Sequence, residues 1–294
     1  WHTGIDKLKA YVPGKAIEDV KEELGLSEVF RLASNENPYG PPEKSIIAMQ
    51  QALREAHLYP EATSRGLREK LGELYDVDSN QIVVSNGADN IISLVGQAYI
   101  NKGDEIIYCT PTFAAYRTIT TIMNGIPVEI PTTEDYRFDL EAILENITDK
   151  TKLIFICNLN NPTGTIVDSD ELKSFLDRVP DHAIVVMDEA YGEFIDEEGY
   201  QMGIDFGKQG YPVLTIRTFS KLYGLAGLRV GYVVGTEELL KPILAVREPF
   251  AVNRIAHDAA VAALEDTTYK EKILAEVKKE KVFLMEAFEK LALE

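Results

Sequence analysis

The chain has few of the residues that mark several common protein classes. Two cysteines among 294 residues are too few for a disulfide scaffold, and with no signal peptide they predict a protein of the reducing cytoplasm. No run of apolar residues approaches the length of a membrane span. The four histidines (His2, His57, His182 and His257) share no spacing typical of metal ligands, so we assign no metal site.

Positive charge is also scarce. The chain has 30 lysines and arginines against 48 aspartates and glutamates, which gives a net charge of -18. Such an excess of negative charge repels nucleic acids and anionic membrane surfaces, so we expect neither as a partner. An anionic small molecule stays compatible with this charge, because it requires only a few local donors.

The length fits one large domain and a small one. Seven short apolar runs predict strands, and they cover residues 81–85, 104–110, 126–131, 152–158, 183–190, 212–218 and 230–235. Helical patterns separate most of them, and the chain is helical after residue 236. This alternation predicts an α/β fold of three layers, with a mainly parallel seven-stranded sheet between two layers of helices. Sheets of this kind bind ligands at the carboxyl ends of their strands.

A lysine lies between the last two predicted strands. Lys221 is preceded by the hydroxyl residues Thr218 and Ser220 and is followed by small residues. A lysine in a polar loop is ordinarily a surface residue. A lysine in a pocket of low dielectric constant instead has a lowered pKa and attacks carbonyl groups. Three motifs at the ends of other strands favour the second interpretation.

The first strand ends in the sequence Asn86-Gly87-Ala88-Asp89, which opens a helix. Small residues at a helix N-terminus leave backbone N–H groups free to bind phosphate. An ordinary strand-to-helix turn capped by Asp89 is the alternative. The carboxylate of Asp89 would repel a phosphate, so only its backbone N–H group would serve in such a site.

Two further strands end in polar residues. The strand at 152–158 leads into three asparagines in the segment 158–164, which are more than a turn requires. Asp188 follows five apolar residues and precedes Tyr191; a carboxylate at the end of a buried strand requires a cationic partner, unless it caps a helix. A phosphate cradle, a carboxylate, a phenol and a lysine are together the groups that pyridoxal phosphate requires.

Seven motifs occur in a fixed order along the chain: SNENPYGP, YPE, NGADN, PTFAAY, NNPTG, DEAY and TFSKLYGLAGLRVGY. With them the chain, from about residue 11 to residue 294, resembles the fold type I pyridoxal-phosphate aminotransferases, in particular the subgroup that acts on histidinol phosphate. The resemblance implies a homodimeric enzyme that exchanges an amino group between L-histidinol phosphate and 2-oxoglutarate, the partner of glutamate, in histidine biosynthesis. An aromatic amino acid aminotransferase, a threonine-phosphate decarboxylase and a non-catalytic domain of the same fold are the alternatives.

The resemblance also implies a role for each matching residue. Lys221 would form the Schiff base with pyridoxal 5'-phosphate and carry the transferred proton, and Asp188 would pair with the pyridine nitrogen. Asn161 and Tyr191 would bind the ring oxygen. The phosphate would be held by the residues Gly87, Ala88, Asp89, Thr218, Ser220 and Arg229.

Four more residues have expected roles by the same resemblance. Phe113 would stack on the cofactor ring, unless it is an ordinary core residue, and Tyr59 would reach the phosphate bound by the neighbouring subunit. Tyr11 and Asn37 would lie on the substrate side.

The resemblance implies three parts of the chain. Residues 1–38 would form an N-terminal arm and part of the small domain, residues 39–265 the large cofactor-binding domain, and residues 266–294 the start of the small domain. The family extends beyond the position of Glu294, so we expect the small domain to be incomplete in this sequence. The arginines that hold the substrate's carboxylate and phosphate would lie in that further segment.

Overall fold

The computed structural model describes residues 5–8 and 15–292. Tyr11 therefore lies outside the described residues. Within the described part of the chain, no helix combines the length and the apolar character needed to cross a membrane.

A single seven-stranded sheet forms the centre of the molecule, in the order β1-β7-β6-β5-β4-β2-β3. Its strands are β1 (Ile82–Ser85), β2 (Glu105–Thr110), β3 (Ile126–Pro131), β4 (Thr151–Cys157), β5 (Ile184–Asp188), β6 (Val213–Thr218) and β7 (Gly231–Val234). Strand β7 is antiparallel to both of its neighbours, and the other four pairs are parallel. The mainly parallel sheet predicted from the sequence is confirmed.

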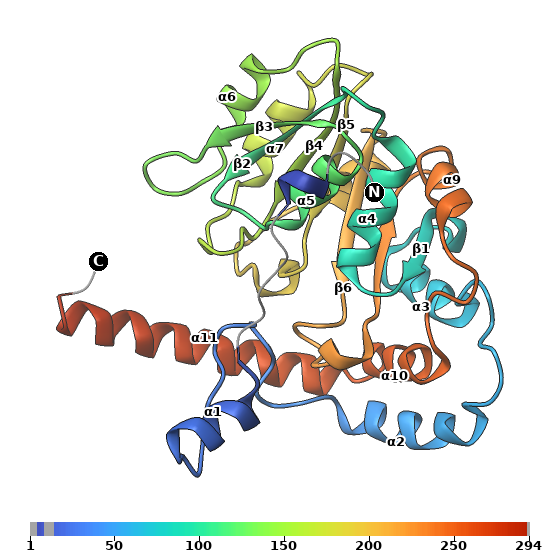
Figure 1. Cartoon of the computed structure of the whole chain (residues 1–294), viewed down its shortest axis with the longest axis vertical. Coiled ribbons are helices and arrows are strands. Elements are labelled where there is room, and N and C mark those ends of the chain that lie inside the picture. The colour runs from blue at the N-terminus through green and yellow to red at the C-terminus, as the bar shows by residue number, and fades with distance from the viewer. Residues whose placement is uncertain (1–4, 9–14, 293–294) are drawn as a thin grey trace.

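Helices cover the two faces of the sheet. Those that connect or follow the strands are α4 (Ala88–Tyr99), α5 (Ala115–Ile122), α6 (Leu140–Glu145), α7 (Ser169–Leu176), α8 (Gly203–Lys208) and α9 (Glu237–Val246). The connections through α4 and α5 run toward the β3 edge of the sheet, and those through α6, α7 and α8 run the opposite way (Figure 1). Right-handed crossovers then place the two groups on opposite faces, which confirms the three layers.

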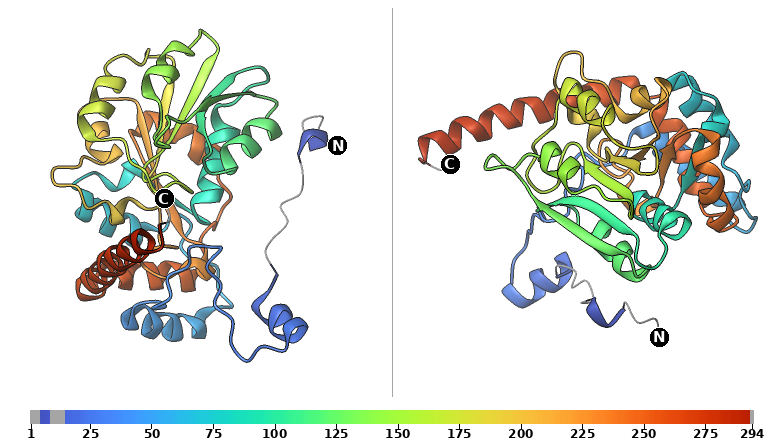
Figure 2. Two further views of the ribbon diagram at one scale, coloured as in Figure 1. Left: turned by 90° about the vertical axis from the view of Figure 1, so that its left-hand side faces the viewer. Right: turned by 90° about the horizontal axis from the view of Figure 1, so that it is seen from above.

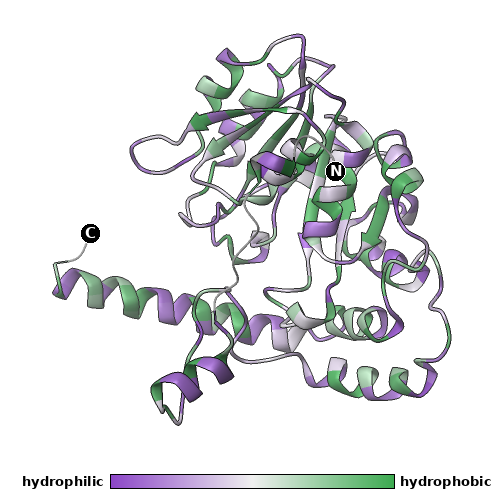
Figure 3. Ribbon diagram, viewed as in Figure 1, coloured by the Kyte–Doolittle hydropathy of each residue, from purple (hydrophilic) through white to green (hydrophobic). Residues whose placement is uncertain are grey.

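The strands are apolar because both faces of the sheet are covered. Every residue of β5 is buried, and so is the segment 153–157 of β4. Figure 3 shows these central strands as the most hydrophobic part of the fold. Parallel strands buried on both faces carry continuous apolar runs, and this explains why the polar residues at their ends stand out in the sequence.

A second group of helices lies beside the sheet, below it in Figure 1. It comprises α1 (Ile17–Leu24), α2 (Glu43–Ala52), α3 (Arg65–Tyr75), α10 (Arg254–Leu264) and α11 (Thr267–Lys290). The short 3-10 helices are spread along the chain: η1 (Ile5–Lys7), η2 (Leu53–Glu55), η3 (Ser79–Gln81), η4 (Gly192–Phe194) and η5 (Ala226–Leu228). Ser45 of α2 donates a hydrogen bond to the carbonyl oxygen of Ala259 in α10, at 2.8 Å.

Helices α1 and α11 extend away from the rest of the molecule (Figures 1 and 2). Among the described residues of α11 only Ile273 is buried, and apolar residues such as Phe283 and Phe288 are exposed. Helix α11 begins at Thr267. The division into three parts stays a prediction, since the fold alone does not delimit domains.

Candidate active site

The direction of the strands explains why residues far apart in the sequence meet. Strands β1, β4, β5 and β6 are mutually parallel, so their carboxyl ends share one edge of the sheet, and the antiparallel β7 begins at that edge. A cavity of about 530 Å³ lies there. Ten of the predicted site residues line it: Ala88, Asp89, Phe113, Asn161, Asp188, Tyr191, Thr218, Ser220, Lys221 and Arg229.

Lys221 lies in the cavity, where its ammonium group contacts backbone carbonyls and an aromatic ring. Its Nζ donates to the carbonyl oxygens of Ser34 (3.1 Å) and Asn35 (3.4 Å). The same atom lies 5.3 Å from the centroid of the Tyr191 ring, and the Asn35 side chain donates to the Tyr191 hydroxyl at 3.0 Å. No ion pair among the described residues includes Lys221. Its amine therefore has only weak partners that a carbonyl-bearing ligand could replace.

Asp188 is a buried carboxylate, 3% exposed, at the end of β5. The Tyr116 hydroxyl donates to its Oδ2 at 2.6 Å, and the backbone N–H of Ala190 donates to its Oδ1 at 3.1 Å. Burial raises the pKa of Asp188, and the hydrogen bond from Tyr116 offsets part of that rise. Within the described part of the chain this carboxylate has no ion-pair partner, so a cationic group of a ligand fits beside it.

The donors expected to hold a phosphate also lie together. The Thr218 hydroxyl contacts the Ser220 hydroxyl at 3.0 Å and accepts from the Ser220 backbone N–H at 3.1 Å. Arg229 pairs with Asp89 at 3.3 Å, and their side chains are 43% and 60% exposed. Such an exposed pair contributes at most about 1 kcal/mol, so a phosphate can compete for the guanidinium group.

Gly87 makes the approach of Arg229 to this helix end possible. It is the N-cap of α4 and has a φ of 86°, a conformation that favours glycine. A Cβ atom at this position would lie 2.8 Å from Nη2 of Arg229. A side chain would therefore displace the guanidinium group from the N-terminus of α4.

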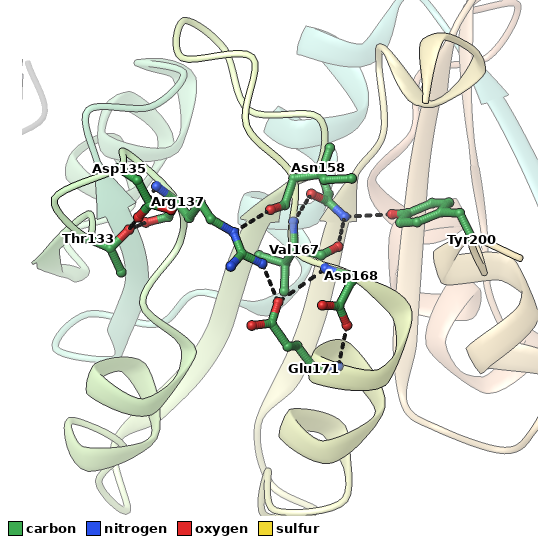
Figure 4. Close-up of polar contacts among 9 residues, drawn as sticks. Thr133, Asp135, Arg137, Asn158, Val167, Asp168, Glu171 and Tyr200 are labelled. Carbon is green, nitrogen blue, oxygen red and sulfur yellow. Dashed lines mark hydrogen bonds and ion pairs between the residues drawn. The ribbon is translucent and has the colours of Figure 1, made fainter. Parts of the chain in front are cut away.

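The loop after β4 explains the three asparagines (Figure 4). The buried amide of Asn158 accepts from the backbone N–H of Val167 and donates to its carbonyl oxygen, both at 2.9 Å, and also donates to the Tyr200 hydroxyl at 2.6 Å. Asn160 binds the hydroxyls of Thr112 and Thr163, each at 2.8 Å. Two of the asparagines thus close the loop, and the third, Asn161, lines the cavity.

The segment that returns from this loop is itself held in place, as Figure 4 shows. Arg137 donates from Nε to the carbonyl oxygen of Ile166 at 2.9 Å and pairs with Glu171. Asp168 caps α7 through the backbone N–H of Glu171 at 2.8 Å. The chain on both sides of Asn161 is therefore fixed by side-chain hydrogen bonds.

Besides Gly87, which is the N-cap of α4 and does not itself line the cavity, three more predicted residues lie outside this cavity or outside the described chain. Tyr59 is 78% exposed, and its ring stacks on Phe250 with centroids 4.6 Å apart. Asn37 lines a neighbouring cavity of about 590 Å³ and donates to the carbonyl oxygen of Leu222 at 2.8 Å. Nothing is described for Tyr11. The roles expected of these three residues stay predictions.

The sequence interpretation overlooked two parts of the site. Tyr116 belongs to the PTFAAY motif, from which only Phe113 was chosen, although both rings lie at the site and meet edge to face at 5.9 Å. Ser34 and Asn35 belong to the motif from which only Asn37 was chosen. The fold brings this motif to the cavity, where the carbonyl oxygen of Ser34 accepts from Lys221 and the side chain of Asn35 donates to Tyr191.

The residues present fit pyridoxal phosphate. Among the described residues the buried carboxylate of Asp188 lacks a cation and Lys221 lacks a carboxylate partner. Arg229 lines the same cavity as the hydroxyls of Thr218 and Ser220. The cavity has a volume typical of sites for small ligands, which range from about 300 to 1,000 Å³. These groups can hold a phosphorylated, nitrogen-containing aldehyde.

Comparison with known proteins gives the aminotransferase family that the sequence motifs resemble. The profile of the family described as aminotransferase class I and II matches residues 27–294. The histidinol-phosphate aminotransferase of Caldicellulosiruptor saccharolyticus is 43% identical over 98% of this chain and 80% of its own length. The enzyme of the same name from Moorella thermoacetica is also 43% identical, over 98% of this chain and 75% of its own length.

Solved structures share the fold. The histidinol-phosphate aminotransferase of Sinorhizobium meliloti, solved in complex with pyridoxal-5'-phosphate, has a TM-score of 0.84 and 24% identity, over 95% of this chain and 74% of that one. The Clostridium acetobutylicum enzyme of the same name has a TM-score of 0.80 and 26% identity, over 88% and 76% of the two chains.

The family assignment agrees with the chemistry of the cavity. Class I and II aminotransferases act through pyridoxal phosphate, so the cofactor implied by the sequence motifs is confirmed. The profile match over residues 27–294 and the 43% identity to two curated enzymes establish that this chain belongs to the class I and II aminotransferase family.

Proposed function

We propose that this chain transfers the amino group between L-histidinol phosphate and 2-oxoglutarate, with pyridoxal phosphate held in the 530 Å³ cavity. The observation that carries the proposal is the meeting of Lys221, Asp188 and Tyr191 in one cavity with the hydroxyls of Thr218 and Ser220. These residues come from strand ends separated in the sequence. A structural turn at any one strand end would not require this set.

Each side chain has a distinct task at the cavity. Asp188 keeps a proton on the ring nitrogen of the cofactor, because an ionised carboxylate in a buried site stabilises a neighbouring cation. Tyr191 and Asn161 bind the ring oxygen. When bound, pyridoxal phosphate supplies the electron sink for the carbon that loses a proton. Lys221 Nζ removes that proton from the substrate and returns it at the end of the transfer.

The phosphate of the cofactor is bound by a separate set of groups. Arg229, the hydroxyls of Thr218 and Ser220, and the backbone at Gly87, Ala88 and Asp89 supply a cation and neutral donors at the N-terminus of α4. Phe113, which lines the same cavity, packs against the cofactor ring. Binding and chemistry are thereby assigned to different residues, so they can be tested separately.

The names of the curated relatives support histidinol phosphate as the substrate in this proposal. Two curated proteins that match 98% of this chain are named histidinol-phosphate aminotransferases. Histidinol phosphate carries a primary amine and a phosphate. Glutamate and 2-oxoglutarate serve as the second pair, and Asn37 and Tyr11 lie on the substrate side in this proposal.

A half-reaction screen tests this substrate. The protein is loaded with pyridoxal phosphate and mixed separately with histidinol phosphate, phenylalanine and threonine phosphate, while the cofactor absorbance and the products are followed. We expect the fastest conversion to the amine form of the cofactor with histidinol phosphate. Faster conversion with phenylalanine, or release of carbon dioxide from threonine phosphate, would contradict the proposal.

We further propose that the active unit is a homodimer in which Tyr59 serves the site of the neighbouring subunit. The support is that Tyr59 is highly exposed and lies outside its own subunit's cavity, next to another exposed aromatic ring, Phe250. Exposed aromatic side chains that lie together are typical of protein–protein contacts. A chain that stays monomeric and fully active in light scattering and activity measurements would contradict this.

For location we propose the cytoplasm. Cys109 and Cys157 are both free and buried, and free thiols persist in a reducing compartment. Fractionation of the native host, with the protein detected in the cytoplasmic fraction by antibody, tests this proposal.

A further inference from the structure

A buried cluster of charges lies behind the turn that carries Asp188 and Tyr191. Arg217 of β6 donates from Nη1 to Glu189 at 3.1 Å, and its Nη2 forms an ion pair with Glu193 at 2.6 Å. The side chains of Arg217, Glu189 and Glu193 are 2%, 0% and 6% exposed. None of the three lines the cavity at the strand ends.

The turn presents its side chains alternately to the cavity and to this cluster. Asp188 lines the cavity, the next residue, Glu189, pairs with Arg217, Tyr191 lines the cavity again, and Glu193 pairs with Arg217. On the neighbouring strand Arg217 faces the cluster and Thr218 faces the cavity. On β6 the alternation of Arg217 and Thr218 follows from the pleat of the strand. One guanidinium group thus holds the turn on both sides of Tyr191.

The packing leaves this clasp (Arg217, Glu189 and Glu193) little freedom. The backbone N–H of Gly203 donates to the second oxygen of Glu189 at 2.7 Å, and the sulfur of Met202 lies 3.0 Å from Nη1 of Arg217. A Cβ atom at Gly192 would lie 2.4 Å from the same Nη1 atom. Gly192 therefore lets the turn pass directly over the guanidinium group.

Stability alone does not explain a clasp of this kind. Burying one cation and two carboxylates costs several kcal/mol per ion, and apolar residues of similar size often stabilise a protein as well or better. A buried, bidentate guanidinium group instead fixes geometry, because its planar donors accept few arrangements of two carboxylates. A requirement for exact placement of the turn accounts for the clasp better than stability does.

We propose that Arg217, acting through Glu189 and Glu193, is a positioning residue that fixes Asp188 and Tyr191 against the ring of the cofactor. This inference rests on the proposed function, since it assumes that Asp188 faces the ring nitrogen and Tyr191 the ring oxygen. Loss of the clasp would let the turn shift without removing any group that touches the cofactor. The phosphate donor Arg229 follows η5 and would stay in place, and Thr218 lies on β6 rather than on the turn that the clasp holds.

The test uses the full chain loaded with pyridoxal phosphate and the variants Arg217→Lys and Glu193→Gln. Arg217→Lys keeps the charge and loses the two-pronged contact, and Glu193→Gln keeps the shape and loses one charge. Arg178→Lys is the matched control, because Arg178 pairs with Glu141 on the exposed surface. Each protein is titrated with base while the absorbance of the bound cofactor is recorded without substrate. Then kcat, KM and cofactor affinity are measured per mole of bound cofactor.

We expect both clasp variants to shift the apparent pKa of the cofactor band by about 0.5 unit or more, since Asp188 and Tyr191 control the charge on the ring. We expect kcat to fall about tenfold or more, because misplacement by an ångström costs up to about a hundredfold, with KM and cofactor affinity within about threefold. The control should show none of these changes. If Arg217→Lys does not fold, Glu193→Gln decides the test by the same criteria.

The proposal is overturned if the band and kcat per bound cofactor are unchanged while only the melting temperature falls, because the cluster would then be structural alone. An equal change in Arg178→Lys would overturn it too. The absorbance is recorded without substrate, so a protein that rejects histidinol phosphate contradicts only the proposed substrate. A wild-type chain with no cofactor band contradicts both the proposed function and this inference.

Discussion

Replacing Tyr116 by phenylalanine isolates one hydrogen bond to the carboxylate of Asp188. The Tyr116 hydroxyl donates to Asp188 at 2.6 Å, and both residues are buried. Burial first, and the neighbouring charge of Asp188 next, raise the pKa of Tyr116 well above its usual value, so the hydroxyl stays a donor throughout the accessible pH range. The ring stacks on Phe155 at 4.5 Å, and phenylalanine preserves that contact. The variant therefore removes one donor and leaves no cavity larger than an oxygen atom.

The magnitude follows from the charge of the acceptor. A hydrogen bond to a charged group contributes about 1.5–3 kcal/mol. Because the bond stabilises the ionised form of Asp188 more than the neutral form, losing it should raise the pKa of Asp188 in the folded protein. Burial already holds that pKa above its usual value of 3.8, and the variant raises it further.

Because the pKa of Asp188 is raised, the way in which protein stability changes with pH can be stated. A carboxyl group whose pKa is raised by folding stabilises the protein fully below 3.8, and this contribution is lost as the pH rises through the folded-state pKa. In Tyr116→Phe the folded-state pKa of Asp188 is higher, so this stabilising contribution continues to fall up to a higher pH. The two proteins should therefore be closest in stability at acid pH and differ by the full amount once Asp188 is ionised in both.

Urea unfolding of the cofactor-free wild type and Tyr116→Phe at several pH values from acid to slightly alkaline measures this difference. Tyr108→Phe is the matched control, because Tyr108 donates at 2.9 Å to Glu129, whose carboxylate is partly exposed. We expect the control to change stability less and with little dependence on pH. A difference below about 0.5 kcal/mol at alkaline pH, the size of a neutral surface substitution, would refute the reasoning. So would a difference that does not change with pH.

Three further predictions concern the proposed roles. Lys221→Ala should fold and bind pyridoxal phosphate only reversibly; borohydride reduction of the wild type followed by peptide mass analysis should label Lys221, and a label on another lysine would contradict the assignment. Asp188→Asn should keep the cofactor but lower kcat by about a hundredfold or more, since an amide cannot hold the ring proton; near-normal turnover in stopped-flow kinetics would exclude this role. Inactive Lys221→Ala chains mixed with Tyr59→Phe chains should regain activity, because the mixed dimer contains one native site; no gain after subunit exchange would argue against a shared site.

The layout of the sheet could be predicted because its cause is local. Strands such as β4 and β5 carry continuous apolar runs, and a polar residue at the end of such a run, as at Asp188, marks the position where the strand leaves the core. The antiparallel direction of β7 could not be predicted in this way. It depends on the short connection after Lys221, which turns the chain back beside β6 and places Arg229 at the start of β7.

Contacts between distant segments account for the parts of the site that the sequence did not reveal. Tyr116 and Asp188 are 72 positions apart, and Lys221 and Ser34 are 187 positions apart. A tyrosine on an amphipathic helix resembles any core tyrosine until the strand beside it is known. The residue pattern alone does not separate Asn161 from Asn158, and only the family resemblance selected Asn161; the fold adds that the side chain of Asn158 is occupied by Val167.

The arrangement at the ends of β5 and β6 also indicates why a charged residue lies next to a residue of the cavity on each of these strands. Side chains in a strand alternate between its two faces, so a residue that faces the cofactor cavity is followed by one that faces the protein interior. Asp188 and Thr218 line the cavity, and their neighbours Glu189 and Arg217 pair with each other behind it at 3.1 Å. A reactive side chain at a strand end must keep part of its surface open to the ligand, so it cannot be fixed by packing on every side. The adjacent buried pair supplies the contacts that it lacks, and for this reason the residues behind the site should be as sensitive to substitution as many that line it.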